Sequence, residues 1–445
     1  MTPQLPTLAD LVRAFARIGL LGFGGPAAQI ALMHRIVVDE KRWLGEARFL
    51  HALNFCMLLP GPEAQQLATY TGWLARGVTG GLVAGLLFIL PGALVMMGLS
   101  ALYAFHADLA WVQGVFYGVK CAVIALVVQA LIRIAHRALK TGALRAVALA
   151  AFLALFLFAL PFPLVILAAA LVGLILARLA PAAPAAAAGA PGAIDLAMDQ
   201  GLLPHTAARP ARFWMQLALW TALWLAPVAV LLLALGPGNV FADLAGFFAR
   251  MAVVTFGGAY AVLAYVAQAA VETHGWLSAS EMIDGLGLAE TTPGPLILVL
   301  QFVGFLAAFR AETGLDPLLA GLLGGLLTLW VTFAPSFLFI FAGAPYAERL
   351  RQNVGLASAL AAISAAVVGV IAHLALWFAL HVLFARVSDW SAGPLRLAVP
   401  DWTTLDGTAL ALTALALVLV LRLRIGVAPL VLVFALAGLG VGLIR

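Results

Sequence analysis

The 445-residue chain is 64% hydrophobic and 10% charged, whereas soluble domains are about 45–50% apolar and about 25% charged. This composition excludes a soluble globular protein. The net charge of +5 does not indicate a nucleic-acid partner, because the basic residues fall in short loops between apolar runs, as topology signals do. The two cysteines lack the spacing of a zinc or disulfide framework, so we expect no metal and no cofactor.

Apolar runs recur along the chain, and many approach the roughly 20 residues that a helix needs to cross hydrocarbon. They are Gly81–Leu102, Val119–Ile134, Ala146–Leu176, Leu217–Leu235, Leu318–Ala342, Ala357–Phe384 and Ala409–Leu421. The sequence therefore predicts an all-α, polytopic integral membrane protein.

Near the N-terminus, several segments are too short to cross the membrane singly. They are Pro26–Val38, Ala47–Leu59 and Glu63–Ala75. About 13 residues make roughly 20 Å of helix, against about 30 Å of hydrocarbon. We predict two re-entrant hairpins of half-helices, Leu11–Val38 and Ala47–Ala75, broken at Phe23-Gly24-Gly25-Pro26 and at Pro60-Gly61-Pro62.

An internal repeat relates the two halves of the chain. Four landmarks return 233 positions later, Phe15-Ala16-Arg17 as Phe248-Ala249-Arg250, Phe23-Gly24-Gly25 as Phe256-Gly257-Gly258, Trp43-Leu44 as Trp276-Leu277, and Pro60-Gly61-Pro62 as Pro293-Gly294-Pro295. The second half gains about eleven residues around Glu312–Pro317, and the Ala- and Pro-rich stretch Pro181–Pro210 has the composition of a flexible linker. We therefore predict a first repeat (1–178), a linker (179–212) and a second repeat (213–445).

The loop charges indicate that the second repeat is inverted. The loop at Arg35–Arg48 carries four Lys or Arg residues, whereas the equivalent loop carries only the acidic Glu272, Glu281 and Asp284. Because basic loops face the cytoplasm, these two loops belong on opposite sides. The additional apolar segment Trp214–Leu235 supplies the odd crossing. Inverted-topology repeats are typical of secondary transporters, whose solute binds near the midplane where the repeats meet.

The breaks supply the candidate binding site. A helix that starts after a break leaves its first N–H groups unpaired at the positive end of its dipole, which favours anions. Irregular backbone within a bilayer must be buried in protein or line a cavity, so we expect the four breaks to converge on one site; the alternative is helix kinks that only aid packing. The candidate substrate-binding residues at the breaks are Gly24, Gly25, Pro26, Pro60, Gly61, Pro62, Gly257, Gly258, Pro293, Gly294 and Pro295. Neutral donors beside them, which either contact the anion or satisfy broken backbone, are Gln65, Gln66, Thr255, Thr291 and Thr292.

These motifs closely resemble the chromate ion transporter family in its long, two-domain bacterial form. The resemblance rests on Phe23–Pro26, Asn54–Ala68, Thr255–Gly258 and Thr291–Pro295, and it fails only in the linker. It implies a secondary transporter in the bacterial inner membrane that exports chromate, a tetrahedral dianion, and so confers resistance. A permease for sulfate or another oxyanion is the alternative. Besides the oxyanion and lipid, protons and a second copy of the chain are candidate partners.

Five charged side chains have alternative roles. Lys120 lies in an apolar stretch and either helps to hold the anion or extends to the membrane surface. Arg17 and Arg250 occupy equivalent positions, either flanking the site or lying near opposite surfaces. Glu63 and Glu290 sit beside the two Pro-Gly-Pro turns, where each either carries a coupling proton or has a structural role, as Glu63 would by capping its helix start.

An enzyme is the competing class of function. His34 and Asp39 have a spacing typical of acyltransferases, but neither residue recurs in the second repeat. No metalloprotease, serine-hydrolase or P-loop motif is present, and the absence of a P-loop also argues against direct ATP drive. We therefore expect a transporter, with no catalytic residues, driven by an ion gradient or the membrane potential.

Overall fold

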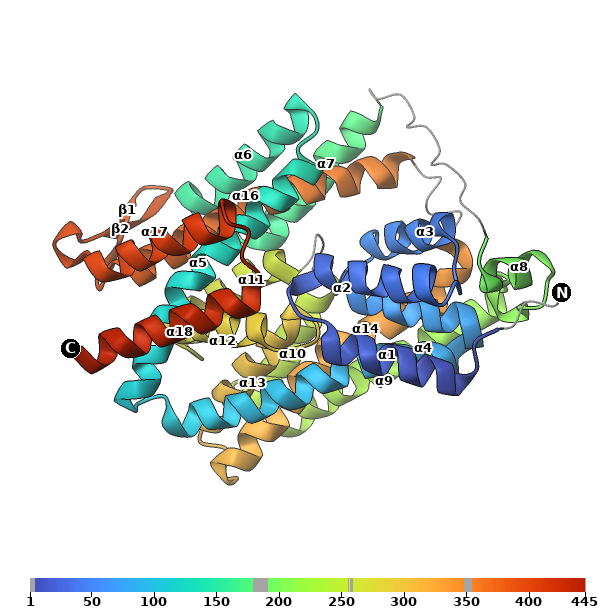
Figure 1. Cartoon of the computed structure of the whole chain (residues 1–445), viewed down its shortest axis with the longest axis horizontal. Helices are drawn as coiled ribbons and strands as arrows, with labels where there is room; N and C mark the ends of the chain where they lie inside the picture. Colours follow the sequence, from blue (N-terminus) through green and yellow to red (C-terminus); the bar gives the residue numbers. More distant parts are fainter. Residues whose placement is uncertain (1–4, 179–190, 255, 257–258, 348–353, 445) are drawn as a thin grey trace. The chain divides into compact units, whose positions relative to one another are not determined.

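The computed structural model describes residues 5–178, 191–254, 256, 259–347 and 354–444, and nearly all of its regular structure is helical (Figure 1). Six of the described helices are long and apolar enough to cross a bilayer. They are α4 (Glu63–His106), α5 (Ala110–Ala138), α9 (Pro210–Leu235), α14 (Pro317–Gly343), α16 (Val354–Leu383) and α18 (Val427–Ile444). The prediction of an all-α membrane protein is confirmed.

Short helices surround the breaks, as predicted. The first are α1 (Leu8–Leu21), α2 (Gly25–His34), the π-helical turn η1 (Arg35–Glu40) and α3 (Glu46–Met57). Within α4, Arg76 and Gly77 leave helical geometry, with φ of −142° and +62°, so a short helix of residues 63–75 precedes a long one. Their re-entry into a membrane stays a prediction.

The order of elements in the first half returns in the second. The counterparts of the first four are α10 (Val240–Val254), α11 (Ala259–Gln268), the π-helical turn η3 (Ala269–Thr273) and α12 (Ala279–Thr291). They are followed by the 3-10 turn η4 (Leu296–Leu298) and α13 (Val299–Arg310). A π-helix is rare, so its recurrence at equivalent positions indicates that the two halves share local structure. The inserted residues form the loop between α13 and α14, at the position where α4 only kinks.

The chain forms two compact units, and each takes helices from both halves of the sequence. The first contains residues 1–98, 180–259 and 292–357, and the second contains 99–179, 260–291 and 358–445. The repeats predicted from sequence therefore divide the chain differently from its compact units, and the proposed repeat boundaries and their inversion stay predictions.

In the first unit, α14 packs against α9, α10 and α13. Small residues allow α13 and α14 to approach closely, at Gly304 and Gly324. A Cβ added at either glycine would clash with backbone and side-chain atoms of the other helix. The indole of Trp224 on α9 donates a hydrogen bond to the carbonyl oxygen of Val331 at 3.0 Å. This polar tie fixes the register of α9 on α14.

The predicted linker is partly ordered, which contradicts a wholly flexible segment. The short helix α8 (Ala193–Asp199) packs within the first unit, where Asp195 accepts a hydrogen bond from Gly45 N–H at 2.7 Å and pairs with Arg48 at 3.2 Å. Further along, His205 Nε2 contacts the carbonyl oxygen of Trp73 at 2.9 Å. Burial lowers the pKa of His205, opposed by its backbone hydrogen bonds. The local composition did not predict this order, because the polar contacts join residues that are far apart in the sequence.

In the second unit, α5 packs against α12, α17 (Gly407–Leu421) and α18, and Figure 1 shows α17 and α18 beside it. The apolar run Ala146–Leu176 is two helices, α6 (Gly142–Phe158) and α7 (Phe162–Ala177), because the chain turns at Ala159. A two-stranded antiparallel hairpin, β1 (Val387–Ala392) and β2 (Leu395–Pro400), was not expected from the sequence.

Candidate functional site

Glycines with left-handed backbone create the described breaks. The φ angles are +86° at Gly24, +76° at Gly25, +116° at Gly61 and +90° at Gly294. A side chain is strained in this region, so the glycines are needed for the chain to turn between two helices. The remaining break contains Thr255, Gly257 and Gly258, which lie outside the described residues.

A small pocket in the first unit lies where the segments that follow the breaks begin. It is lined by Pro26, Gln29, Pro62, Glu63, Ala64, Ala259, Pro295, Leu296 and Ile297. These residues belong to the starts of α2, α4, α11 and η4. Its volume is about 10 Å³, which is close to the space of one water molecule. An oxyanion therefore requires the helix starts to separate slightly.

The lining is rich in backbone donors. Glu63, Ala64, Leu296 and Ile297 lie at helix starts, where N–H groups have no partner within their own helix. The cap of α2 is Gly24, which provides no side-chain acceptor for those groups. Lys, Arg and His are absent from the described lining. The pocket can therefore solvate a negative charge through backbone N–H groups and helix dipoles, without a buried cation.

Gln29 ties two breaks together and was not predicted. Its side chain is fully buried, and its Nε2 donates to the carbonyl oxygens of Gly22 at 3.0 Å and Gly294 at 2.5 Å. The N–H of Gly294 also donates to the carbonyl oxygen of Gly22, at 3.0 Å. Its sequence signal was a single polar residue in the apolar stretch 25–33 of α2.

The last break also lies close to the long part of α4. A Cβ added at Gly92 would lie 3.0 Å from the carbonyl carbon of Pro293 and closer still to its oxygen. Pro293 and Gly294 therefore rest directly on the backbone of α4 at a point where only glycine fits. Pro60, by contrast, is held within its own break, because Gln66 Nε2 donates to its carbonyl oxygen at 2.7 Å.

The predicted neutral donors mostly satisfy protein groups. Gln65 is fully buried and donates to Thr69 Oγ1 at 3.0 Å. The Thr291 hydroxyl is 2.9 Å from the carbonyl oxygen of Leu288 in its own helix, a helical back-bond. Thr292 is buried. None of these side chains lines the small pocket.

Lys120 lies in the second unit and outside the lining of the small pocket. Its ammonium is 3.3 Å from Asp284 and 2.5 Å from the hydroxyl of Ser280, and Tyr103 donates to Asp284 at 2.8 Å. Assigning Asp284 to a loop was wrong, because it is buried within α12. A buried carboxylate needs a charged partner, and Lys120 supplies it.

The remaining charged candidates separate into different environments. Glu63 lines the small pocket, whereas Glu290 is buried in the second unit and accepts a hydrogen bond from Tyr260 at 2.5 Å. Arg17 is half-exposed and pairs with Glu40 at 2.8 Å. Arg250 is exposed and donates to the carbonyl oxygen of Gly246 in its own helix.

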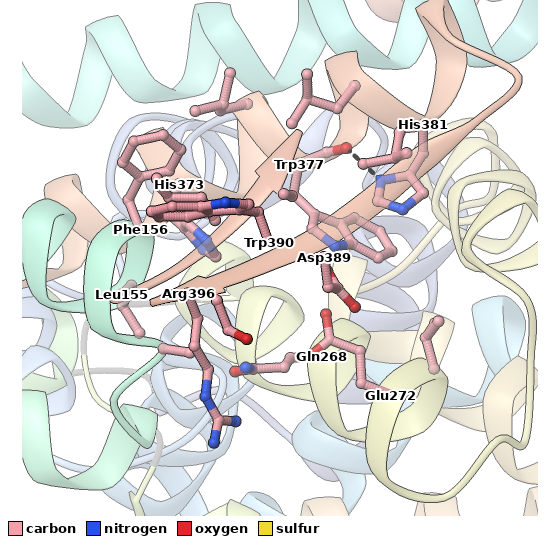
Figure 2. Close-up of a pocket in the computed structure, with 18 of the residues that line it drawn as sticks. Leu155, Phe156, Gln268, Glu272, His373, Trp377, His381, Asp389, Trp390 and Arg396 are labelled. Atoms are coloured by element: carbon pink, nitrogen blue, oxygen red, sulfur yellow. Dashed lines mark hydrogen bonds between the residues drawn. The ribbon is translucent and has the colours of Figure 1, made fainter. Parts of the chain in front are cut away.

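A larger cavity, of about 760 Å³, lies in the second unit between α16, η3, α6 and the hairpin (Figure 2). Trp377 and Trp390 give it aromatic walls. Figure 2 shows the carboxylates of Glu272 and Asp389 directed toward a common space beside Trp377, and these like charges repel each other. The described lining also contains the guanidinium of Arg396 and the imidazoles of His373 and His381. None of the site residues predicted from the sequence lines this cavity.

The residues considered for acyl transfer form a surface cluster. His34 lies 3.5 Å from Asp39 and 2.5 Å from Glu46, and both carboxylates are exposed. These contacts connect the end of α2 with η1 and with the start of α3. Neither of the two described cavity linings includes His34.

Comparisons with known proteins agree on one family. The model of the chromate transporter family matches residues 9–174 and 242–441. A chromate transport protein of Pseudomonas aeruginosa is 34% identical, over 83% of this chain and 80% of its own length. One of Cupriavidus metallidurans is 28% identical, over 82% and 81%, and a probable chromate transport protein of Synechococcus elongatus is 26% identical, over 87% and 91%. No solved structure gives a significant match.

Proposed function

Because this chain belongs to the chromate transporter family, we propose that it is a secondary transporter that binds chromate in the small pocket at the helix starts and exports it. Transport of chromate and a multi-pass membrane location follow from the family and the apolar helices. The proposal adds the binding site, the direction of movement, the bacterial inner membrane as location and the resulting resistance.

One observation carries the choice of site. The residues that open α2, α4, α11 and η4 line a single pocket, although they are distant in sequence. The starts of α2, α4 and α11 offer backbone donors and positive dipole ends to a tetrahedral anion, and the turn η4, which leads into α13, adds further N–H groups. Sulfate has the same shape and charge as chromate. The alternative function is therefore that of a permease that binds sulfate at the same site.

Glu63 suits the coupling role better than Glu290. When a carboxylate and a bound anion lie side by side, uptake of one proton by the pair is favoured, because like charges disfavour the state in which both are fully ionised. Glu63 lines the pocket, whereas Glu290 does not. We therefore assign proton coupling to the pocket that Glu63 lines, and a structural role to Glu290. The family match to both halves supports the division into repeats 1–178 and 213–445.

The test is chromate flux in oriented membrane vesicles. Everted vesicles containing the protein are expected to accumulate radiolabelled chromate, sulfate to compete weakly, and a protonophore to reduce accumulation. Ala64→Val, which narrows the pocket from a buried position, is expected to lower flux at normal detergent-extracted protein levels. Accumulation only in right-side-out vesicles would contradict export, and equal accumulation with and without the protein would contradict transport.

A further inference from the structure

The small pocket presents an acceptor as well as donors. The orientation of the Gln29 amide is fixed, because its nitrogen faces two carbonyl oxygens, which can only accept. The amide oxygen Oε1 is therefore the remaining atom. It is buried and has no hydrogen-bond partner among the described residues. A buried acceptor without a partner is unfavourable, so a ligand that donates a hydrogen bond to it is favoured.

The second acceptor group in the lining is the carboxylate of Glu63. Neither group suits a fully ionised oxyanion, which has only acceptor oxygens. Lys, Arg and His are absent from the described lining, so no side-chain cation offsets a double negative charge. Backbone N–H groups carry only partial charge, about +0.5 elementary charge at each helix start. The pocket therefore matches an anion with a lower charge and one hydroxyl group.

We propose that the site takes its oxyanion singly protonated, as hydrogenchromate, with the anion's hydroxyl donating to Gln29 Oε1 and its other oxygens accepting from backbone N–H groups. This inference rests on the proposed function of the pocket. The anion carries its proton into the site and out of it again, so no protein side chain gains or loses a proton. The Glu63 carboxylate disfavours a second negative charge on the ligand and thereby selects against dianions.

Protonation gives the site a means of separating chromate from sulfate. The two dianions share shape and charge, but hydrogenchromate is a weak acid and hydrogensulfate a strong one. Near neutral pH part of the chromate carries a proton, whereas sulfate carries essentially none. Selenate is a sharper comparison, because it has nearly the size of chromate and the weak basicity of sulfate. A difference in affinity between chromate and selenate therefore reports the protonation of the anion and not how well its size fits the pocket.

Equilibrium binding to the detergent-purified full chain tests this inference without a transport gradient. Radiolabelled chromate binding is measured between pH 6 and pH 9, with selenate and sulfate as competitors. Above the pKa of hydrogenchromate, affinity is expected to fall about tenfold per pH unit, as one proton is taken up with the anion. Selenate is expected to compete at least about tenfold more weakly than unlabelled chromate. Equal competition by selenate with the same pH dependence would place the proton on the protein and overturn the inference.

A variant pair strengthens the test. Glu63→Gln removes a negative charge from the pocket, so selenate competition is expected to strengthen by about tenfold, because a dianion then binds without a like charge beside it. Glu290→Gln removes a buried carboxylate outside the pocket lining and is expected to leave the chromate-to-selenate ratio unchanged. Unchanged selectivity in a folded Glu63→Gln protein would refute the role of Glu63. Failure to bind chromate at any pH would instead refute the proposed function.

Discussion

Close approach between α4 and the last break makes Gly92 a sensitive position. In Gly92→Ala the new methyl group would lie 3.0 Å from the carbonyl carbon of Pro293 and 2.6 Å from Leu298 Cδ1. Normal carbon contacts are about 3.5–4.0 Å, so the break must move by roughly 1 Å. Overpacking of this kind costs about 1–3 kcal/mol, and a displacement of about 1 Å in positioned groups can reduce rates by about 100-fold. We expect chromate flux to fall at least about tenfold.

Gly98→Ala is the matched control for this prediction. It lies on the same helix, and a Cβ there meets no atom within 4 Å. We expect flux like that of the unmodified protein, because alanine also has the higher helix propensity. The assay is chromate uptake into everted vesicles, normalised to detergent-extracted protein. Equal flux in Gly92→Ala and Gly98→Ala proteins would refute the view that the Pro293 break must rest on α4.

Three further predictions address the first break, the topology and the buried ion pair. Gly25→Ala, at a φ of +76° with free space around its Cβ, is expected to reduce chromate flux through backbone strain of about 1–3 kcal/mol, and normal flux would show that this turn tolerates a side chain. Reporters fused after Arg42 and after His274 are expected to mark opposite sides of the membrane, the first cytoplasmic, and a shared side would contradict inversion. Lys120→Met is expected to destabilise the protein in detergent by about 3–5 kcal/mol, seen as a lower unfolding temperature, because it leaves Asp284 buried without its cation. Adding Asp284→Asn should restore most of that loss, and a single variant as stable as the parent would contradict a structural ion pair.

Local chemistry explains why the breaks were predictable from the sequence. Glycine and proline determine backbone geometry within a few residues, so Gly24, Gly61 and Gly294 identify turns whatever surrounds them. The short helices follow from the spacing of these turns. Their convergence on one pocket also follows from a general constraint, because irregular backbone at membrane depth must be buried in protein or line a cavity.

Long-range contacts explain what the sequence analysis missed. Gln29 acts through the carbonyl of Gly294, far along the chain, and its equivalent in the second half is Val262, so the repeat gave no signal. Asp284 resembles a loop residue until Lys120 is placed beside it. The docked linker likewise depends on the contact between Asp195 and Arg48. Such pairings are set by tertiary packing and not by local pattern.

The position of bound chromate tests the central claim most directly. Crystals of the protein grown with chromate allow the chromium atom to be located by its anomalous scattering. The peak is expected among the helix starts, within hydrogen-bonding reach of the N–H groups of Glu63, Ala64 and Leu296 through the anion's oxygens, with Gln29 Oε1 facing one oxygen. A chromium peak beside Lys120, or in the larger cavity and not in this pocket, would contradict the account.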